Sequence, residues 1–218
     1  VEMDANALPD LRTGASAAVA LEYVCEDRPR HVAIVGTGRV ALQIAIACDA
    51  VFDLESITVT SRRPENRTRF VEAASVVSRA RIEAVADVPT CIEKADTVFT
   101  AVPTSRPVLT RSDVGGRFLV AVGGDARTRQ LASDILEEVV ILPDLLEQTL
   151  ASCEFVEARM ARKIESIRFA RAGKVVLDIG DAANGRMQAE RPQVLYLTGM
   201  AALDLCACGG SRFRTPVP

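Results

Sequence analysis

A glycine-rich turn is the first pattern in this sequence that could do chemistry. It has the form G-x-G-x-x-A and directly follows the apolar run 31–35; its residues are Gly36, Thr37, Gly38, Arg39, Val40 and Ala41. Between a strand and a helix, the first glycine permits a tight turn, the second lets the backbone approach a pyrophosphate, and the alanine lets the helix pack closely on the sheet. Free N–H groups at the start of that helix favour phosphate oxygens. The turn therefore predicts a dinucleotide site; the alternative is a glycine turn that binds nothing.

A second group of polar residues follows the next apolar run, 57–60. A site that prefers NAD usually has an acidic residue there, which holds the ribose 2′-hydroxyl. This sequence has Ser61, Arg62 and Arg63 instead. Because arginine binds phosphate through a planar fork of donors, these residues predict a preference for NADP(H) over NAD(H). The alternative is that the two arginines are ordinary solvated surface residues.

The apolar runs 97–102 and 118–122 end beside residues that could face the rest of the cofactor and a substrate. Open α/β folds bind ligands at the carboxyl ends of their parallel strands. Asp125, after two glycines, is the carboxylate best placed for proton transfer to a substrate. Its alternative role is that of a turn or helix-capping residue, because Asp is common in both. The cofactor contacts expected at these ends are Ala101, Val102, Pro103, Val122 and Gly123.

These residues need a scaffold in which strands and helices alternate. The pattern predicts an α/β fold with a doubly wound parallel sheet, the Rossmann architecture, covered on both faces. The expected strands are 31–35, 57–60, 81–85, 97–102, 118–122, 139–142 and 194–197. The expected helical segments are 1–30, 39–50, 65–78, 88–94, 131–138, 145–171 and 199–208. Residues 173–179 are expected to be extended, 180–185 to form a loop and 209–218 to be flexible. We expect 28–191 to form the dinucleotide-binding domain, with 1–27 and 192–218 as parts of a smaller substrate or dimerisation domain.

Composition excludes several broad classes. The 218 residues are 49% hydrophobic with a net charge of −3, which argues against global disorder and against a basic nucleic-acid-binding protein. No apolar run has the length of a membrane span and no signal peptide is visible, so we expect a cytoplasmic protein with neither membrane nor nucleic-acid partners. The six cysteines are too scattered for a zinc site or a disulfide framework, and no metal is expected. The chain begins with Val1, from which we expect a start inside a longer reading frame or a shortened family member.

Four segments, together with the glycine turn, resemble the ornithine cyclodeaminase/mu-crystallin family. They lie in the family's order along nearly the whole chain: LRTGAS at 11–16, TAVPTSRPVL at 100–109, VGGD at 122–125 and LTGMAALDL at 197–205. The family comprises NAD(P)-dependent enzymes of amino acids and imines, including cyclodeaminases, alanine dehydrogenases, ketimine reductases and opine-type dehydrogenases. The resemblance implies a Rossmann fold, a nicotinamide cofactor and a small amino-acid or imine substrate.

The resemblance also implies roles for single residues. Arg12 matches the arginine that binds the substrate carboxylate, and Asp125 matches the catalytic aspartate near the substrate amine or imine. Thr198 falls in the segment that approaches the cofactor from the C-terminal side. Family members carry a segment before the Arg-Thr-Gly-Ala element that supplies a catalytic lysine, most of the substrate pocket and the dimer sheet. This sequence shows no counterpart of it, and its three lysines match no family motif. His31, the only histidine, is expected to be structural or exposed.

Three functions fit these observations. The first is an NADP(H)-dependent oxidoreductase that acts on an amino acid or on an imine or keto acid. The second is a nucleotide-binding protein whose catalytic site is incomplete or needs a partner. The third is a cyclodeaminase-type ammonia lyase that recycles bound NAD. The small-residue run at 14–21 must pack on something, so we expect a homodimer or association with another chain.

Overall fold

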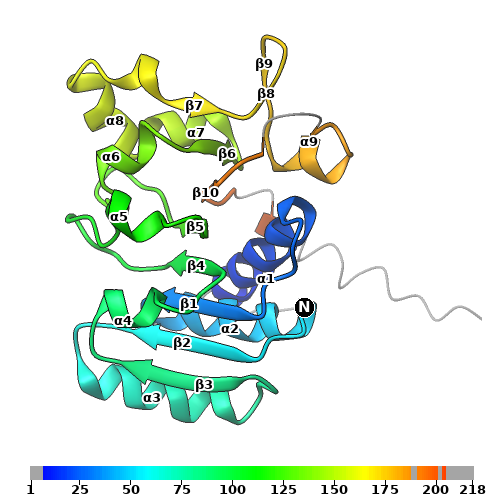
Figure 1. Cartoon of the computed structure of the whole chain (residues 1–218), viewed down its shortest axis with the longest axis vertical. Coiled ribbons are helices and arrows are strands. Elements are labelled where there is room, and N and C mark those ends of the chain that lie inside the picture. The colour runs from blue at the N-terminus through cyan, green and yellow to red at the C-terminus, as the bar shows by residue number, and fades with distance from the viewer. Residues whose placement is uncertain (1–6, 188–190, 201–202, 205–218) are drawn as a thin grey trace, which may run out of the picture.

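A parallel sheet of eight strands forms the centre of the molecule. The computed structural model describes residues 7–187, 191–200 and 203–204. The strand order is β3-β2-β1-β4-β5-β10-β6-β7, which Figure 1 shows from bottom to top. The strands are β1 (His31–Val35), β2 (Ser56–Thr60), β3 (Arg81–Val85), β4 (Thr97–Thr100), β5 (Phe118–Val122), β6 (Val140–Pro143), β7 (Arg168–Phe169) and β10 (Val194–Leu197). Neighbouring strands pair in parallel throughout, so the expected Rossmann-like α/β class is confirmed.

Helices cover both faces of this sheet, and successive residues of a strand point alternately to one face and to the other. Val32 and Ile34 of β1 belong to one buried core, while Ala33 and Val35 belong to the other. The first core is completed by α1 (Ala7–Val24), α2 (Arg39–Val51), α3 (Pro64–Ser75) and α9 (Ile179–Ala183). The second is completed by α4 (Val88–Ile92), α5 (Arg111–Val114), α6 (Ser133–Leu136), α7 (Leu146–Ala151) and α8 (Cys153–Met160).

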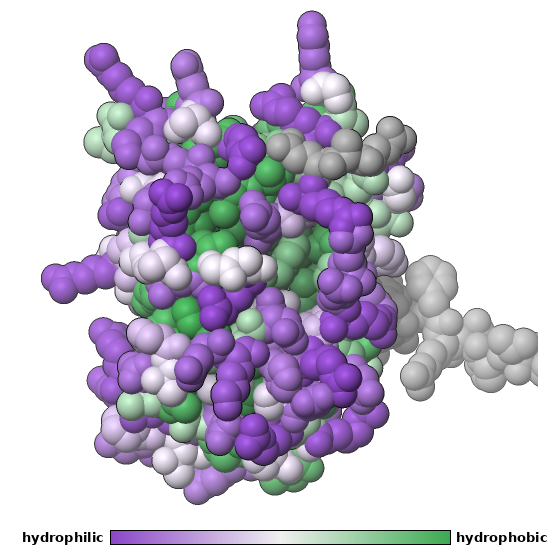
Figure 2. All heavy atoms as spheres, viewed as in Figure 1, coloured by the Kyte–Doolittle hydropathy of each residue, from purple (hydrophilic) through white to green (hydrophobic). Residues whose placement is uncertain are grey.

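Polar residues cover much of the face of the molecule that Figure 2 shows. Figure 2 shows hydrophilic residues around one face, with hydrophobic residues visible in its upper half, where Figure 1 places β5 and β10. Among the described residues, no helix is both long and apolar enough to cross a membrane.

The small-residue run of α1 packs against α2. Gly14 lies directly against the backbone of Gln43, so that any side chain at this position would collide with α2. Ala17, Ala18 and Leu21 on the same helix are fully buried. The close approach of the two helices therefore explains why this part of the sequence is so rich in glycine and alanine.

Two expectations about the later part of the chain are wrong. The expected loop 180–185 is largely the helix α9, because Asp178 and Asp181 form a capping box: each carboxylate accepts the other residue's main-chain N–H, at 2.9 and 3.2 Å. The expected helical region 145–171 is broken into α7, α8, a 3-10 turn (Ile164–Ser166) and the edge strand β7. A short hairpin of β8 (Arg171–Ala172) and β9 (Val175–Val176) follows.

The expected helix 199–208 and the tail 209–218 lie largely or wholly outside the described residues. The domain boundaries at 28 and 191 stay a prediction. The segment after 191 contributes β10 to the main sheet, where it pairs with β5 on one side and β6 on the other.

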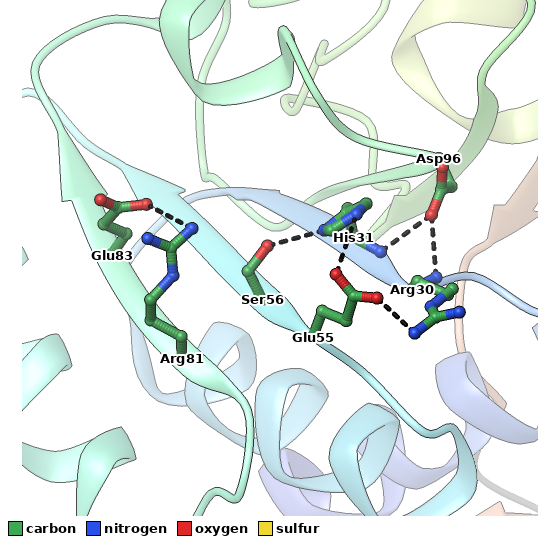
Figure 3. A network of polar contacts seen from close by, with 7 residues as sticks. All are labelled: Arg30, His31, Glu55, Ser56, Arg81, Glu83 and Asp96. Carbon is green, nitrogen blue, oxygen red and sulfur yellow. Dashed lines mark hydrogen bonds and ion pairs between the residues drawn. The ribbon is translucent and has the colours of Figure 1, made fainter.

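The amino ends of the first strands are held by a polar network that includes the only histidine (Figure 3). The carboxylate of Asp96 accepts the main-chain N–H groups of Arg30 and His31, both at 2.8 Å. The His31 ring lies 3.0 Å from Ser56 Oγ, and Glu55 forms an ion pair with Arg30 and lies 3.6 Å from His31 Nε2. This network lies at the edge opposite the carboxyl ends of the strands, so His31 has a structural setting away from the candidate site.

Candidate functional site

The glycine turn adopts a backbone that only glycine tolerates easily at its first position. Gly36 has φ +130°, and a Cβ there would approach the carbonyl oxygen of Ala101 to 2.5 Å. Its N–H donates to the carbonyl of Thr60 at 2.9 Å, which ties the turn to the end of β2. Ala41, in the first turn of α2, is fully buried, as expected for the residue that lets the helix pack on the sheet. The turn thus brings the ends of β1, β2 and β4 together.

Gly38 serves the opposite purpose, because it leaves space open. It is the N-cap of α2, with an ordinary φ of −84°, and a Cβ added to it would meet nothing within 4 Å. The unpaired N–H groups of the first turn of α2 begin here and carry the positive end of the helix dipole. An open space at this helix start, without a side chain to fill it, fits a bound phosphate group.

The end of β2 carries hydroxyl and guanidinium groups beside this turn. Thr37 Oγ1 donates to Ser61 Oγ at 2.8 Å, and Arg67 donates to the carbonyl of Ser61 at 2.5 Å. Arg62 and Arg63 are exposed at the start of α3. Arg39 is committed elsewhere, since it pairs with Asp10 of α1 at 2.7 Å. The end of β2 therefore offers a positive, hydroxyl-bearing rim rather than an acidic residue.

A cavity of about 630 Å³ opens at the carboxyl ends of β4, β5 and β10. Its volume is typical of a site for a small molecule or part of a cofactor. The wall opposite the strands comes from α1 and α9. Of the residues predicted from the sequence, the cavity is lined by Arg12, Val40, Ala101, Val102, Pro103, Val122, Gly123, Asp125 and Thr198. Apart from Val40, the predicted residues of the glycine turn and of the β2 end lie outside this lining, around the start of α2; their role stays a prediction.

Arg12 reaches the cavity from α1, and one nitrogen of its guanidinium group is bonded to a neighbouring carboxylate. Its Nε donates to Asp204 Oδ1 at 2.8 Å, and its side chain is 18% exposed. Nη1 would lie 2.9 Å from a Cβ at Gly199, whose φ is +80°. Because Nε is engaged, the guanidinium is fixed in orientation, and no other described residue takes up Nη1 or Nη2, which leaves these donors for a ligand. A carboxylate is the group that such a pair of donors binds best.

Asp125 is both a turn residue and a cavity residue. Its Oδ1 accepts the main-chain N–H groups of Arg127 at 2.7 Å and Thr128 at 2.6 Å. These hydrogen bonds, the one from Arg127 first, hold the pKa of the Asp125 carboxyl below its ordinary value. Both bonds use Oδ1, so Oδ2 is the oxygen left for a ligand. An exposed carboxylate that stays ionised suits a cationic amine or iminium better than it suits donating a proton at neutral pH.

Asp144 is a site residue that the sequence analysis missed. It follows β6 and lies 2.8 Å from the hydroxyl of Thr198 through Oδ1, while Oδ2 accepts the N–H of Gly199 at 2.7 Å. Gln148 of α7 also lies 2.9 Å from the Thr198 hydroxyl. The turn after β10 is therefore fixed by side chains from the neighbouring strand end. The sequence feature that could have identified Asp144 is its position directly after an apolar strand.

A buried polar trio behind the cavity was also missed. Glu154 is 3% exposed, accepts the hydroxyl of Tyr196 at 2.7 Å through Oε2, and accepts the main-chain N–H of Gln130 at 2.7 Å through Oε1. Burial raises the pKa of Tyr196, which keeps its hydroxyl protonated and donating. Nothing in the spacing of these residues distinguishes Glu154 from Glu157, the exposed acidic residue of the same helix.

The described part of the chain contains no group of three or more His, Cys, Asp and Glu side chains that could hold a metal ion. Cys48 and Cys91 are buried, and burial raises the pKa of both thiols, that of Cys91 to about 12. These two thiols are therefore core side chains rather than reactive groups.

Comparison with known proteins shows which family this chain is similar to. A family model described as the ornithine cyclodeaminase/mu-crystallin family matches residues 1–209. The Delta(1)-pyrroline-2-carboxylate reductase of Paracoccus denitrificans is 26% identical over 151 residues, 68% of this chain and 48% of that protein. The alanine dehydrogenase of Archaeoglobus fulgidus is 26% identical over 207 residues, 93% of this chain and 62% of that protein.

Solved structures share the fold. The Thermococcus litoralis Delta(1)-pyrroline-2-carboxylate reductase, solved in complex with NADH and L-proline, superposes with a TM-score of 0.78 at 21% identity, covering 93% of this chain and 63% of that one. This chain thus spans from about half to less than two thirds of the length of these three relatives.

Proposed function

This chain belongs to the ornithine cyclodeaminase/mu-crystallin family, and from that premise we propose that it binds a nicotinamide dinucleotide and transfers hydride to or from an amino acid or its imine. The observation that carries the proposal is the open space at Gly38. A side chain would fit there without a clash, yet the sequence leaves the position empty at the start of α2. A pyrophosphate fits this space, and the cavity at β4, β5 and β10 then lies where the nicotinamide half would extend.

The residues at the other end of the cavity supply the substrate contacts in this proposal. Arg12 binds the substrate carboxylate through Nη1 and Nη2, because its Nε is already held by Asp204. Asp125 faces the nitrogen and stabilises its positive charge in the iminium or ammonium form. When bound, the cofactor would supply the hydride that the imine carbon accepts in the reductive direction.

We propose that NADP(H) is preferred to NAD(H). The support is the rim at the end of β2, where Ser61, Arg62 and Arg63 stand in place of an acid, and where the Thr37 hydroxyl orients Ser61. A 2′-phosphate would receive charge-assisted bonds from the guanidinium groups. The relative solved with NADH shows that the family fold also accepts the cofactor without this phosphate.

Binding measurements test both statements. We expect the fluorescence of NADPH to be quenched or shifted when the protein is added, and the Kd of NADPH to be lower than that of NADH. We expect Arg63→Ala to raise the Kd of NADPH by about tenfold while leaving the Kd of NADH within about twofold. Equal Kd values for the two cofactors in the unaltered protein would reject the preference. The absence of binding by either would reject the function.

A second proposal is that turnover needs another chain. In the part of the chain that the structure describes, α1 exposes Leu11, Val19 and Tyr23 on its surface. Val19 and Tyr23 also line the cavity, so a partner packed on this side of α1 would close the substrate site. Light scattering together with an assay of NADPH oxidation across keto acids and amines tests this. A monomer that turns over on its own would reject it.

A further inference from the structure

One buried side chain, Gln130, bonds the main chain of residues that line the cavity at the ends of β4 and β5. It is 1% exposed, and its amide bridges the two strand ends. Oε1 accepts the N–H of Val102 at 3.2 Å, while Nε2 donates to the carbonyls of Val122 at 2.9 Å and Gly123 at 3.2 Å. These partners fix which end of the amide is oxygen and which is nitrogen, because only this orientation satisfies one donor and two acceptors.

The main chain of Gln130 is equally engaged. Its carbonyl accepts the N–H groups of Val108 at 2.8 Å and Leu109 at 3.2 Å, and its own N–H donates to the carboxylate of Glu154. Every polar group of this residue therefore has a partner, and its position is determined from several directions at once. A fully satisfied buried network of this kind is rigid.

Glu154 extends the same frame to β10. Its second oxygen accepts the hydroxyl of Tyr196, whose ring meets Phe155 edge-on at 5.0 Å between centroids. The ring also lies against Gly124, where an added Cβ would approach Tyr196 Cε1 to 2.7 Å. In the turn that carries Gly123, Gly124 and Asp125, the main chain of Gly123 is therefore held by Gln130 and Gly124 packs against Tyr196.

We propose that Gln130, held by Glu154, is a positioning residue for the nicotinamide half of the bound dinucleotide. This inference rests on the proposed function. Val102, Val122 and Gly123, which Gln130 fixes, line the cavity, whereas the glycine turn and the β2 rim that would hold the pyrophosphate and adenosine receive no bond from Gln130 among the described residues. The two halves of the cofactor should therefore respond differently to a change at this position.

Titrating the protein with two ligands tests whether the two halves of the cofactor respond differently. The ligands are NADH and ADP-ribose, and ADP-ribose lacks the nicotinamide ring of NADH. Gln130→Glu places an acceptor against the carbonyls of Val122 and Gly123, and we expect it to raise the Kd of NADH at least about tenfold while the Kd of ADP-ribose stays within about twofold. Gln193→Glu is the matched control: the same chemical change on an exposed residue just before β10, expected to leave both Kd values within about twofold.

A second variant separates positioning from folding. Gln130→Met removes the three side-chain bonds without adding charge, and we expect the same selective loss of NADH affinity from it. Retained ADP-ribose binding reports that the rest of each variant is folded. Equal weakening of both ligands, or of neither, would overturn the positioning role. A wild-type chain that binds none of NADH, NADPH and ADP-ribose would overturn the proposed function itself, a result distinct from failure of the positioning role alone.

Discussion

The two halves of the candidate site are built in different ways. The half around β1 and α2 is made of backbone: Gly36 bends the chain, Gly38 keeps a space open, and α2 turns its free N–H groups toward that space. The half around β5, β10 and β6 is held by side chains from distant parts of the sequence, with Gln130, Glu154 and Asp144 joining elements that are far apart along the chain. A local motif can encode the first half, whereas the second exists only in the folded molecule.

The largest effect should come from the side-chain half, at Asp125. Asparagine keeps an oxygen that can accept the N–H groups of Arg127 and Thr128, so Asp125→Asn should preserve the turn while removing the negative charge. We expect turnover to fall by about a thousandfold and cofactor affinity to stay within about twofold. Steady-state kinetics and a cofactor titration check this. Turnover close to that of the unaltered protein would remove Asp125 from the chemistry.

The second largest effect should be a loss of stability when Glu154, in the side-chain half, is replaced. Glu154→Ala leaves the buried hydroxyl of Tyr196 and the N–H of Gln130 without a partner, which should lower the free energy of unfolding by about 3 kcal/mol. The matched control is Glu157→Ala on the same helix, where the carboxylate is 45% exposed and pairs with Arg129. That change should cost less than about 1 kcal/mol. Urea unfolding measures both, and similar losses from the two would contradict the buried network.

Within the backbone half, two glycines should separate binding from folding. Gly38→Ala adds a Cβ in open space, so we expect unchanged stability and a cofactor Kd that rises by about tenfold. Gly36→Ala adds a Cβ at 2.5 Å from the Ala101 carbonyl oxygen on a backbone with φ +130°, and should destabilise the fold by about 2 kcal/mol. Thermal unfolding and cofactor titration of both variants distinguish these outcomes. Normal cofactor binding by Gly38→Ala would place the pyrophosphate elsewhere.

The smallest effect is a pH dependence of stability at Asp125. The N–H groups of Arg127 and Thr128 lower the pKa of this carboxyl in the folded protein relative to the unfolded chain. Its contribution to stability is therefore complete above the unfolded pKa of about 4, and is lost as pH falls through the lower folded pKa. The difference in unfolding free energy between the unaltered protein and Asp125→Asn should shrink over that acidic range. A difference that grows with acidification would reverse the sign and reject this account.

The comparison also explains how much could be predicted from the sequence. The expected strands follow from short, mainly apolar runs, and the glycine turn follows from glycines that each have a local purpose. The edge strand β7 was missed, because it falls in a region expected to be helical. The helix α9 was missed because Asp178 and Asp181 resemble loop residues until their reciprocal caps are seen. Gln130 and Glu154 were missed because burial of a polar residue depends on partners from other elements, which no spacing rule encodes.

The position of β10 has a consequence for how the chain folds. Val194 pairs with Leu119 of β5 on one side and with Ile141 of β6 on the other, so a late segment completes the middle of the sheet. Until it arrives, β5 and β6 each present an open edge that could pair with another chain. Such non-local pairing is slow, and a growing polypeptide passes through this stage during synthesis. Insertion of residues 194–197 closes both edges at once.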